Sequence, residues 1–360
     1  MDLAGSASAS PSSSRGPTAR RKATMYRKFT VEQLGPYYNS IPDVMNAVGS
    51  FGKYQIFCCF VLSYSSVLWT ADYAFVYQNC STLTPVNVQF FTVMEEFKLI
   101  CARKFYFLWL FTGYLCGHLL GCCLGGLSAD LFGRLSGFFA TLTIGLVSNV
   151  MSIASRNWTA FIAFQIVNGI AMGKMEVNSL TLFIEFTEES FRLVPIAVFQ
   201  SGVAFLVVSL IAFLTVQWRY YFIFVGLISA PLMYLHLVFR ESPRWLLVRG
   251  NADKAAEVLS EIASDRWNKK NLTIVPAQLL VARNRIRRSS SLINAVKSSR
   301  RVLFLFVQIL SSFKWSMVNN FLLATMGNRL VGIHFHLLIN GLVRVLVPIV
   351  VITAFYKVEW

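Results

Sequence analysis

Long apolar segments separated by polar connections are the main pattern along the chain. The apolar runs are continuous, as in Phe205–Phe213, so they predict helices rather than the alternating strands of a membrane barrel. A helix needs about 20 mostly apolar residues to cross a lipid bilayer. Segments of this kind lie at about 54–76, 105–127, 137–155, 159–182, 193–216, 220–239, 302–326 and 333–356. The pattern predicts an all-α fold, a polytopic helix bundle in a membrane.

The composition excludes the soluble classes of protein. The 360 residues are 55% hydrophobic and 14% charged, whereas soluble domains carry about 25% charged residues. A soluble enzyme, a disordered chain and a small secreted module held by disulfides are all inconsistent with these values. We therefore expect the lipid bilayer to be the main partner of the chain.

The net charge of +16 is explained by where the basic residues lie. If the N-terminus is cytoplasmic and the eight segments alternate in direction, the inner connections hold 24 of the 33 Lys and Arg residues and the outer ones hold 6. Inner loops of membrane proteins carry such an excess. No nucleic-acid partner is needed to account for the charge. We expect a multi-pass protein of the plasma membrane with a cytoplasmic N-terminus.

The same pattern divides the chain into five parts. We expect a cytoplasmic tail over 1–53, six spans over 54–239 and a cytoplasmic loop with short helices over 240–301. Two further spans over 302–356 and a cytoplasmic end at 357–360 follow.

The first outer loop carries two candidate modifications. Asn79 begins an Asn-Cys-Ser sequon, which predicts glycosylation on the outer side. Cys80 and Cys101 share this loop, where oxidising conditions permit a disulfide between them. The other cysteines lie within spans and are typical of apolar packing.

Sequence patterns for enzyme chemistry are missing. Gly169–Met175 differs from an ATP-binding loop, since it has three spacer residues rather than four and a Met at the magnesium position. His334 and His336 are two residues apart and face different ways on a helix. We expect no enzyme activity, no use of ATP, no cofactor and no metal site.

Charged residues gather at three inner connections. The first is the segment from Gly126 to Arg134, the second follows the fourth span, and the third is Glu241–Arg244. Opposite charges at neighbouring helix ends can form ion pairs that break and re-form as the inner side opens and closes. The predicted gate residues are Gly126, Asp130, Gly133, Arg134, Glu185, Arg192, Glu241 and Arg244.

These patterns resemble the major facilitator superfamily, and more narrowly its family of organic cation, anion and zwitterion (carnitine) transporters. The segments that carry the resemblance are Val48–Gln55, Phe97–Cys101, Gly126–Arg134, Gly169 with Glu185, Trp218-Arg219, Glu241–Leu246 and Pro348. The resemblance implies a fold of twelve spans in two halves and transport by alternating access. In this chain we expect the complete first six-helix half and two helices of the second half.

The resemblance also implies a cavity lined by the first, fourth and seventh spans. Charged residues within spans cost about 2.5–3.5 kcal/mol each and usually face a cavity or a partner. The candidate cavity residues are Tyr64, Asp72, Lys174, Glu176, Lys314, Trp315 and Arg344. Their mixed charges leave open whether the small organic ion is a cation, a carnitine-like zwitterion or an anion. The alternative is a non-transporting or dominant-negative membrane protein on the same scaffold, because the last four spans of the family fold are missing from the sequence.

The second span carries a stripe of glycines. Gly113, Gly117, Gly121 and Gly125 are four residues apart, so they lie on one face of a helix. Such a stripe lets a neighbouring helix approach closely. We expect it to serve packing rather than substrate binding.

Overall fold

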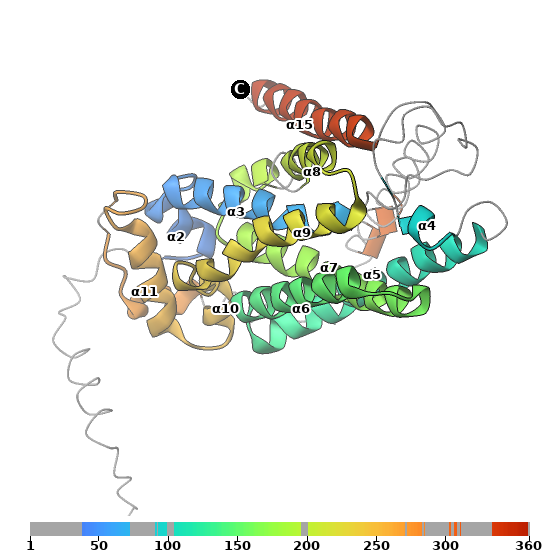
Figure 1. Cartoon of the computed structure of the whole chain (residues 1–360). Helices are drawn as coiled ribbons and strands as arrows, with labels where there is room; N and C mark the ends of the chain where they lie inside the picture. Colours follow the sequence, from blue (N-terminus) through green and yellow to red (C-terminus); the bar gives the residue numbers. More distant parts are fainter. Residues whose placement is uncertain are drawn as a thin grey trace, which may run out of the picture.

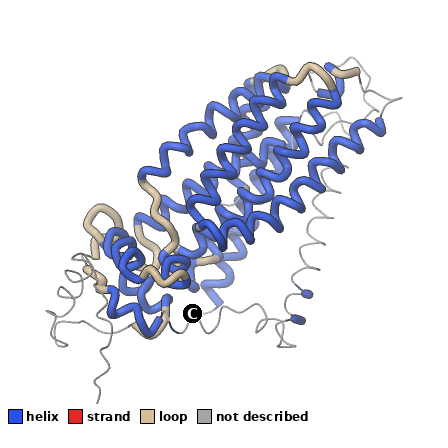
Figure 2. The backbone as a smooth tube through the Cα atoms, turned by 90° about the horizontal axis from the view of Figure 1, so that it is seen from below, coloured by secondary structure: helices blue, strands red, loops and turns tan. Residues whose placement is uncertain are grey.

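Helices make up almost all of the described structure. The computed structural model describes residues 38–72, 91, 93–98, 104–195, 201–270, 272–282, 284, 302–303, 306–307, 310 and 333–358. Within these ranges the only β-type pairing is an isolated bridge between Phe91 and Gln217. The predicted all-α helix bundle is confirmed (Figures 1 and 2). The predicted residues Asn79, Cys80, Cys101, Lys314 and Trp315 lie outside the described residues.

The described long helices overlap seven of the predicted spans, and the seventh span in sequence, at about 302–326, lies largely outside the described residues. The helices are α2 (Ile41–Val48), α3 (Lys53–Thr70), α4 (Val93–Glu96), α5 (Lys104–Phe132), α6 (Arg134–Ala154), α7 (Trp158–Glu185), α8 (Gly202–Leu214), α9 (Trp218–Ser229), α10 (Pro243–Val248), α11 (Ala252–Ala263) and α15 (Ile333–Val358). Short 3-10 turns cover Glu189–Phe191, Ala230–Leu237 and Pro276–Leu279. By length and composition, four helical stretches in the described part are suited to cross a membrane, at Trp109–Phe132, Arg134–Ala154, Trp218–Leu235 and His334–Ala354.

The stripe of glycines on α5 packs directly against α7, as predicted. A methyl carbon placed on Gly117 would lie 2.5 Å from the carbonyl oxygen of Ile166 on α7. From the other side, a methyl carbon on Gly169 would lie 2.5 Å from the carbonyl oxygen of Tyr114 on α5. The two backbones therefore meet without side chains between them. This close approach gives the helices many dispersion contacts and brings their polar groups near one another.

The described part of the loop predicted to be cytoplasmic packs against one end of the bundle. Figure 1 shows α10 and α11 beside α2 at this end. The Asn268 side chain accepts a hydrogen bond from the backbone N–H of Tyr54 at 3.2 Å and donates one to the carbonyl oxygen of Val48 at 3.2 Å. The ring of Trp267 meets Tyr54 edge to face, with centroids 5.0 Å apart. These contacts fix the segment after α11 to the turn between α2 and α3.

An ion pair between α4 and α9 lies at the opposite end of the bundle. Arg219 Nη2 lies 2.6 Å from Glu96 Oε1, and Trp218 Nε1 donates to Glu96 Oε2 at 2.7 Å. Arg219 Nη2 also donates to the carbonyl oxygen of Ser155, just beyond the end of α6, at 2.9 Å. The hydrogen bond from Arg219 holds the pKa of the Glu96 carboxyl below its usual value. This contact ties three connections together.

The glycine contact predicts a specific loss of stability. Gly117→Ala places a methyl group against the backbone of α7, which cannot yield as a side chain can. We expect a loss of about 1–3 kcal/mol, read as a lower thermal unfolding temperature of the purified protein in detergent. The matched control is Gly126→Ala on the same helix, where a methyl carbon would meet nothing within 4 Å. Equal unfolding temperatures for the two variants would contradict this account.

The Glu96 contact predicts a dependence of stability on pH. A carboxyl whose pKa is lowered by folding stabilises the fold at pH values above its pKa in the unfolded chain, about 4.3 for Glu. This contribution is lost as the pH falls through the lower pKa of the folded state. Glu96→Gln should therefore lower the unfolding temperature at pH 7. The loss in free energy of unfolding should be less than about 1 kcal/mol, because the ion pair is partly exposed. In acid the substitution should have less effect. The control is Glu189→Gln, since Glu189 is 62% exposed and pairs with Arg192 at 3.4 Å. The prediction is refuted if the unfolding temperature of Glu96→Gln falls on acidification by as much as that of the unchanged protein.

Candidate functional site

Four charged residues meet where α5 turns into α6. Arg134 is the first residue of α6, and its Nη1 donates to the carboxylate of Asp130, one turn earlier on α5. Its Nη2 lies 3.4 Å from Glu185 Oε1, at the last residue of α7. We call Asp130, Arg134, Glu185 and Glu241 the turn cluster. Arg134 and Glu185 are only 13% and 11% exposed, so their attraction is weakly screened by water.

Glu241 completes the turn cluster by capping α6. Its Oε1 accepts hydrogen bonds from the backbone N–H of Arg134 at 2.9 Å and of Leu135 at 3.1 Å. Free N–H groups and the helix dipole both favour a carboxylate at this position. Gly133 lies between the helices with φ of +113°, and a methyl carbon on it would lie 2.5 Å from Glu241 Oε2. The left-handed backbone conformation therefore favours glycine, and a larger residue would also displace the Glu241 carboxylate.

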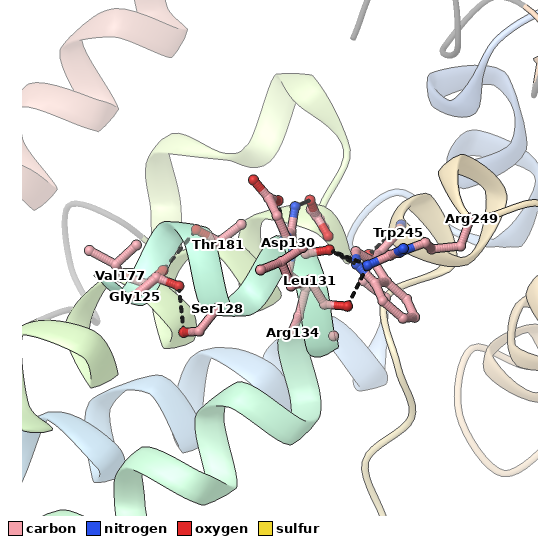
Figure 3. Close-up of polar contacts among 12 residues, drawn as sticks. Gly125, Ser128, Asp130, Leu131, Arg134, Val177, Thr181, Trp245 and Arg249 are labelled. Atoms are coloured by element: carbon pink, nitrogen blue, oxygen red, sulfur yellow. Dashed lines mark hydrogen bonds and ion pairs between the residues drawn. The ribbon is translucent and has the colours of Figure 1, made fainter. Parts of the chain in front are cut away.

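The short helix α10 covers the other side of the same turn. Trp245 Nε1 donates to the carbonyl oxygen of Asp130 at 3.1 Å, and Arg249 Nη2 donates to the same oxygen at 3.0 Å. Arg249 also donates to the carbonyl oxygen of Leu131, and Figure 3 shows its side chain reaching over the end of α5. The carbonyl groups that end α5 are thus satisfied by α10. The sequence did not single out Arg249, and it placed Trp245 only within the Glu241–Leu246 segment of the resemblance, without predicting its contact with α5.

Four of the eight predicted gate residues are not members of the turn cluster, although one of them, Gly133, lies next to Glu241. Arg192 pairs with Glu189 at 3.4 Å, within the connection that follows α7. Arg244 is exposed on α10, and Gly126 lies one turn before Asp130. The structure therefore brings together Asp130, Gly133, Arg134, Glu185 and Glu241 from the predicted set.

Two buried polar atoms of the turn cluster find no hydrogen-bond partner among the described residues. These atoms are Arg134 Nε and Glu185 Oε2. An unpaired buried polar group costs about 1–3 kcal/mol. The turn cluster is held together by ion pairs, yet it is not fully satisfied.

A second polar group lies between α3, α6 and α7. Asp72 is buried, and both of its carboxylate oxygens accept from Asn168 Nδ2, at 3.1 and 3.0 Å. Ser148 on α6 donates to Asn168 Oδ1 at 3.1 Å. The sequence singled out Asp72 but missed Asn168, because an Asn in a helix carries no charge to attract attention.

The other candidate cavity residues have separate surroundings. Tyr64 donates its hydroxyl hydrogen to the carbonyl oxygen of Ile228 on the neighbouring α9, and Lys174 is half-buried on α7. Glu176 lies 3.2 Å from His118 Nε2 on α5. Arg344 on α15 donates to Ser201 Oγ at 3.1 Å and lies 4.7 Å from the ring centroid of Phe205. The printed contacts of these described residues lie at several helix interfaces.

Comparison with known proteins identifies the architecture. The profile of the family described as "Sugar (and other) transporter" matches residues 44–359. The chain belongs to this family. It is a family of membrane transporters rather than enzymes, and the chain is a multi-pass membrane protein. The predicted resemblance to the major facilitator superfamily and its organic cation transporters is confirmed.

Curated relatives match about half of this chain. The protein "Solute carrier family 22 member 1" from Oryctolagus cuniculus is 26% identical over 190 residues, 52% of this chain and 33% of its own length. The "Organic cation transporter protein" from Drosophila melanogaster is 25% identical over 190 residues, 52% of this chain and 34% of its own. The matched region thus spans about a third of these relatives.

Among solved structures, the chain is similar in fold to the xylose transporter XylE from E. coli in a partially occluded, inward-open conformation. The TM-score is 0.59 at 19% identity, over 85% of this chain and 73% of the XylE chain. This similarity confirms the predicted major-facilitator type of helix bundle.

The capping role of Glu241 predicts a loss of stability. Glu241→Gln keeps one acceptor oxygen but removes the negative charge at the start of α6, and we expect this to cost about 0.5–2 kcal/mol. Thermal unfolding of the purified protein measures the effect. The control is Glu257→Gln on α11, an exposed position with the same chemical change. The capping account fails if the two variants unfold at the same temperature.

Proposed function

We propose that this chain transports a small organic ion across the plasma membrane by alternating access, with the turn cluster as part of the gate on the cytoplasmic side. One observation carries the proposal. Arg134 joins the end of α5 to the end of α7 through its side chain, while its backbone binds Glu241 in the segment before α10. A single residue thus links three connections of the bundle.

The partial satisfaction of the turn cluster supports a gating role. When the gate opens, water hydrates Arg134 and Glu185, and this hydration offsets the free energy of their lost ion pair. The unpaired atoms Arg134 Nε and Glu185 Oε2 gain hydrogen bonds in the same step. The free energies of the closed and open arrangements therefore differ less than the ion pairs alone imply, as a switch requires.

The distribution of basic residues supports the proposed orientation. The turn cluster lies at the same end of the bundle as α10 and α11, which belong to the basic loop predicted to be cytoplasmic. The excess of Lys and Arg in that loop favours retention on the inner side. The N-terminus is then cytoplasmic as well.

The substrate class is proposed from the charges within spans and from the relatives. The buried carboxyl of Asp72 suits an organic cation, and one relative from Drosophila is described as an organic cation transporter. Lys174 and Arg344 add positive charge, which suits the carboxylate of a zwitterion or an anion. The proposed substrate is therefore a small organic ion, and the test uses an organic cation, a carnitine-like zwitterion and an organic anion as probes.

Uptake by cells that express the chain tests the proposal. We expect uptake of at least one of a labelled organic cation, carnitine or an organic anion to exceed that of cells without it. Arg134→Ala should reduce this uptake at least about tenfold, since it removes contacts to Asp130 and Glu185 together. Arg134→Lys should restore it only in part, because an ammonium group cannot hold both carboxylates in the planar geometry of a guanidinium.

The control is Lys254→Ala on α11, an exposed residue whose loss removes one positive charge at the same end of the bundle. It should leave uptake unchanged. Surface delivery of the unchanged chain without uptake of any probe would support the alternative, a non-transporting or dominant-negative protein on the same scaffold. Full uptake by Arg134→Ala would reject the turn cluster as a gate.

A further inference from the structure

Three side chains with metal-binding atoms meet at the interface of α5 and α7. His118 and Cys122 are four residues apart on α5, and Glu176 faces them from α7. His118 Nε2 lies 3.2 Å from Glu176 Oε2, and Cys122 Sγ lies 3.6 Å from His118 Nδ1. One ligand atom from each residue can be chosen so that all lie within 4.8 Å of one another. We call these residues the HCE cluster.

The packing of the two helices fixes the backbone of the HCE cluster. A methyl carbon on Gly173 of α7 would overlap the carbonyl oxygen of His118 on α5, so the two backbones are in direct contact one turn before Glu176. Ligands that project from such closely packed helices need little reorganisation to bind an ion, which favours affinity. All three side chains are partly exposed.

The ligand types fit a divalent transition metal. In zinc sites the distances are about 2.3 Å to sulfur, 2.0–2.1 Å to imidazole nitrogen and 2.0–2.2 Å to carboxylate oxygen. Two ligand atoms of one tetrahedral ion are then about 3.3–3.6 Å apart, which the sulfur–nitrogen distance of 3.6 Å already matches. The carboxylate must turn from Nε2 toward Nδ1, a movement of a flexible terminal group.

We propose that His118, Cys122 and Glu176 bind one divalent transition-metal ion of the zinc type. On binding, the thiol of Cys122 releases its proton to solvent and the sulfur donates an electron pair to the ion, with no change of redox state. His118 ligates as the neutral ring, after giving up any proton it shares with Glu176. The charges of thiolate, carboxylate and Zn²⁺ then sum to zero, which lowers the cost of holding an ion at membrane depth.

Protection of cysteines from alkylation tests the site. The complete chain, purified in detergent with a tag that lacks histidine, is treated with a maleimide with and without Zn²⁺, and each modified cysteine is quantified by mass spectrometry. We expect Zn²⁺ to slow modification of Cys122 at least about tenfold. The exposed Cys116 and Cys123 on the same helix are internal controls and should change by less than about twofold.

Two variants make the test specific. Glu176→Gln keeps the shape of the side chain but is a poor ligand, and His118→Gln removes the ring; each should raise the Zn²⁺ concentration needed for protection at least about tenfold. Glu188→Gln, on the connection beyond α7, should not. Equal protection of Cys116, Cys122 and Cys123, unchanged protection in Glu176→Gln, or no protection at all would overturn the proposal. The measurement needs no transport, so it can fail or succeed independently of the proposed function.

Discussion

The backbone contact between α5 and α7 is the constraint on which the rest of the structure depends. The four glycines of α5 and the facing Gly169 and Gly173 of α7 remove the side chains that would otherwise keep the helices apart. Lipid chains are as apolar as the helices, so close packing rather than the hydrophobic effect holds such a pair together in a membrane. Because α5 and α7 are fixed in register, the residues that follow at their ends and along their sides are fixed as well.

Two polar groups follow from this register. At the end of the pair, Asp130 and Glu185 come within reach of the guanidinium of Arg134. Along the pair, His118 comes within 3.2 Å of Glu176. Ionisable groups at membrane depth are costly unless they have partners, and the helix contact supplies a partner for each. The same packing thus sets the proposed gate and the proposed metal site.

The segment from Glu241 to Arg249 shows how the loop after α9 stabilises the bundle. Glu241 satisfies the free N–H groups that begin α6, and Trp245 with Arg249 satisfies the carbonyl groups that end α5. One short segment therefore caps two helices at their shared turn. Movement of α10 away from the turn would expose both ends at once, which couples this loop to the proposed gate.

The sequence by itself determined the helical class, the approximate ranges of the described long helices, the packing role of the glycines on α5, and the placement of Asp130, Gly133, Arg134, Glu185 and Glu241 near helix ends. These features depend on local periodicity and on residue type, which a single chain displays directly. Only the tertiary structure decided that Arg192 pairs within its own connection, that Asn168 holds Asp72, and that Glu176 meets His118 and Cys122. Those contacts join residues far apart in the chain, and the rotation of one helix against another, which no local pattern encodes, brings them together.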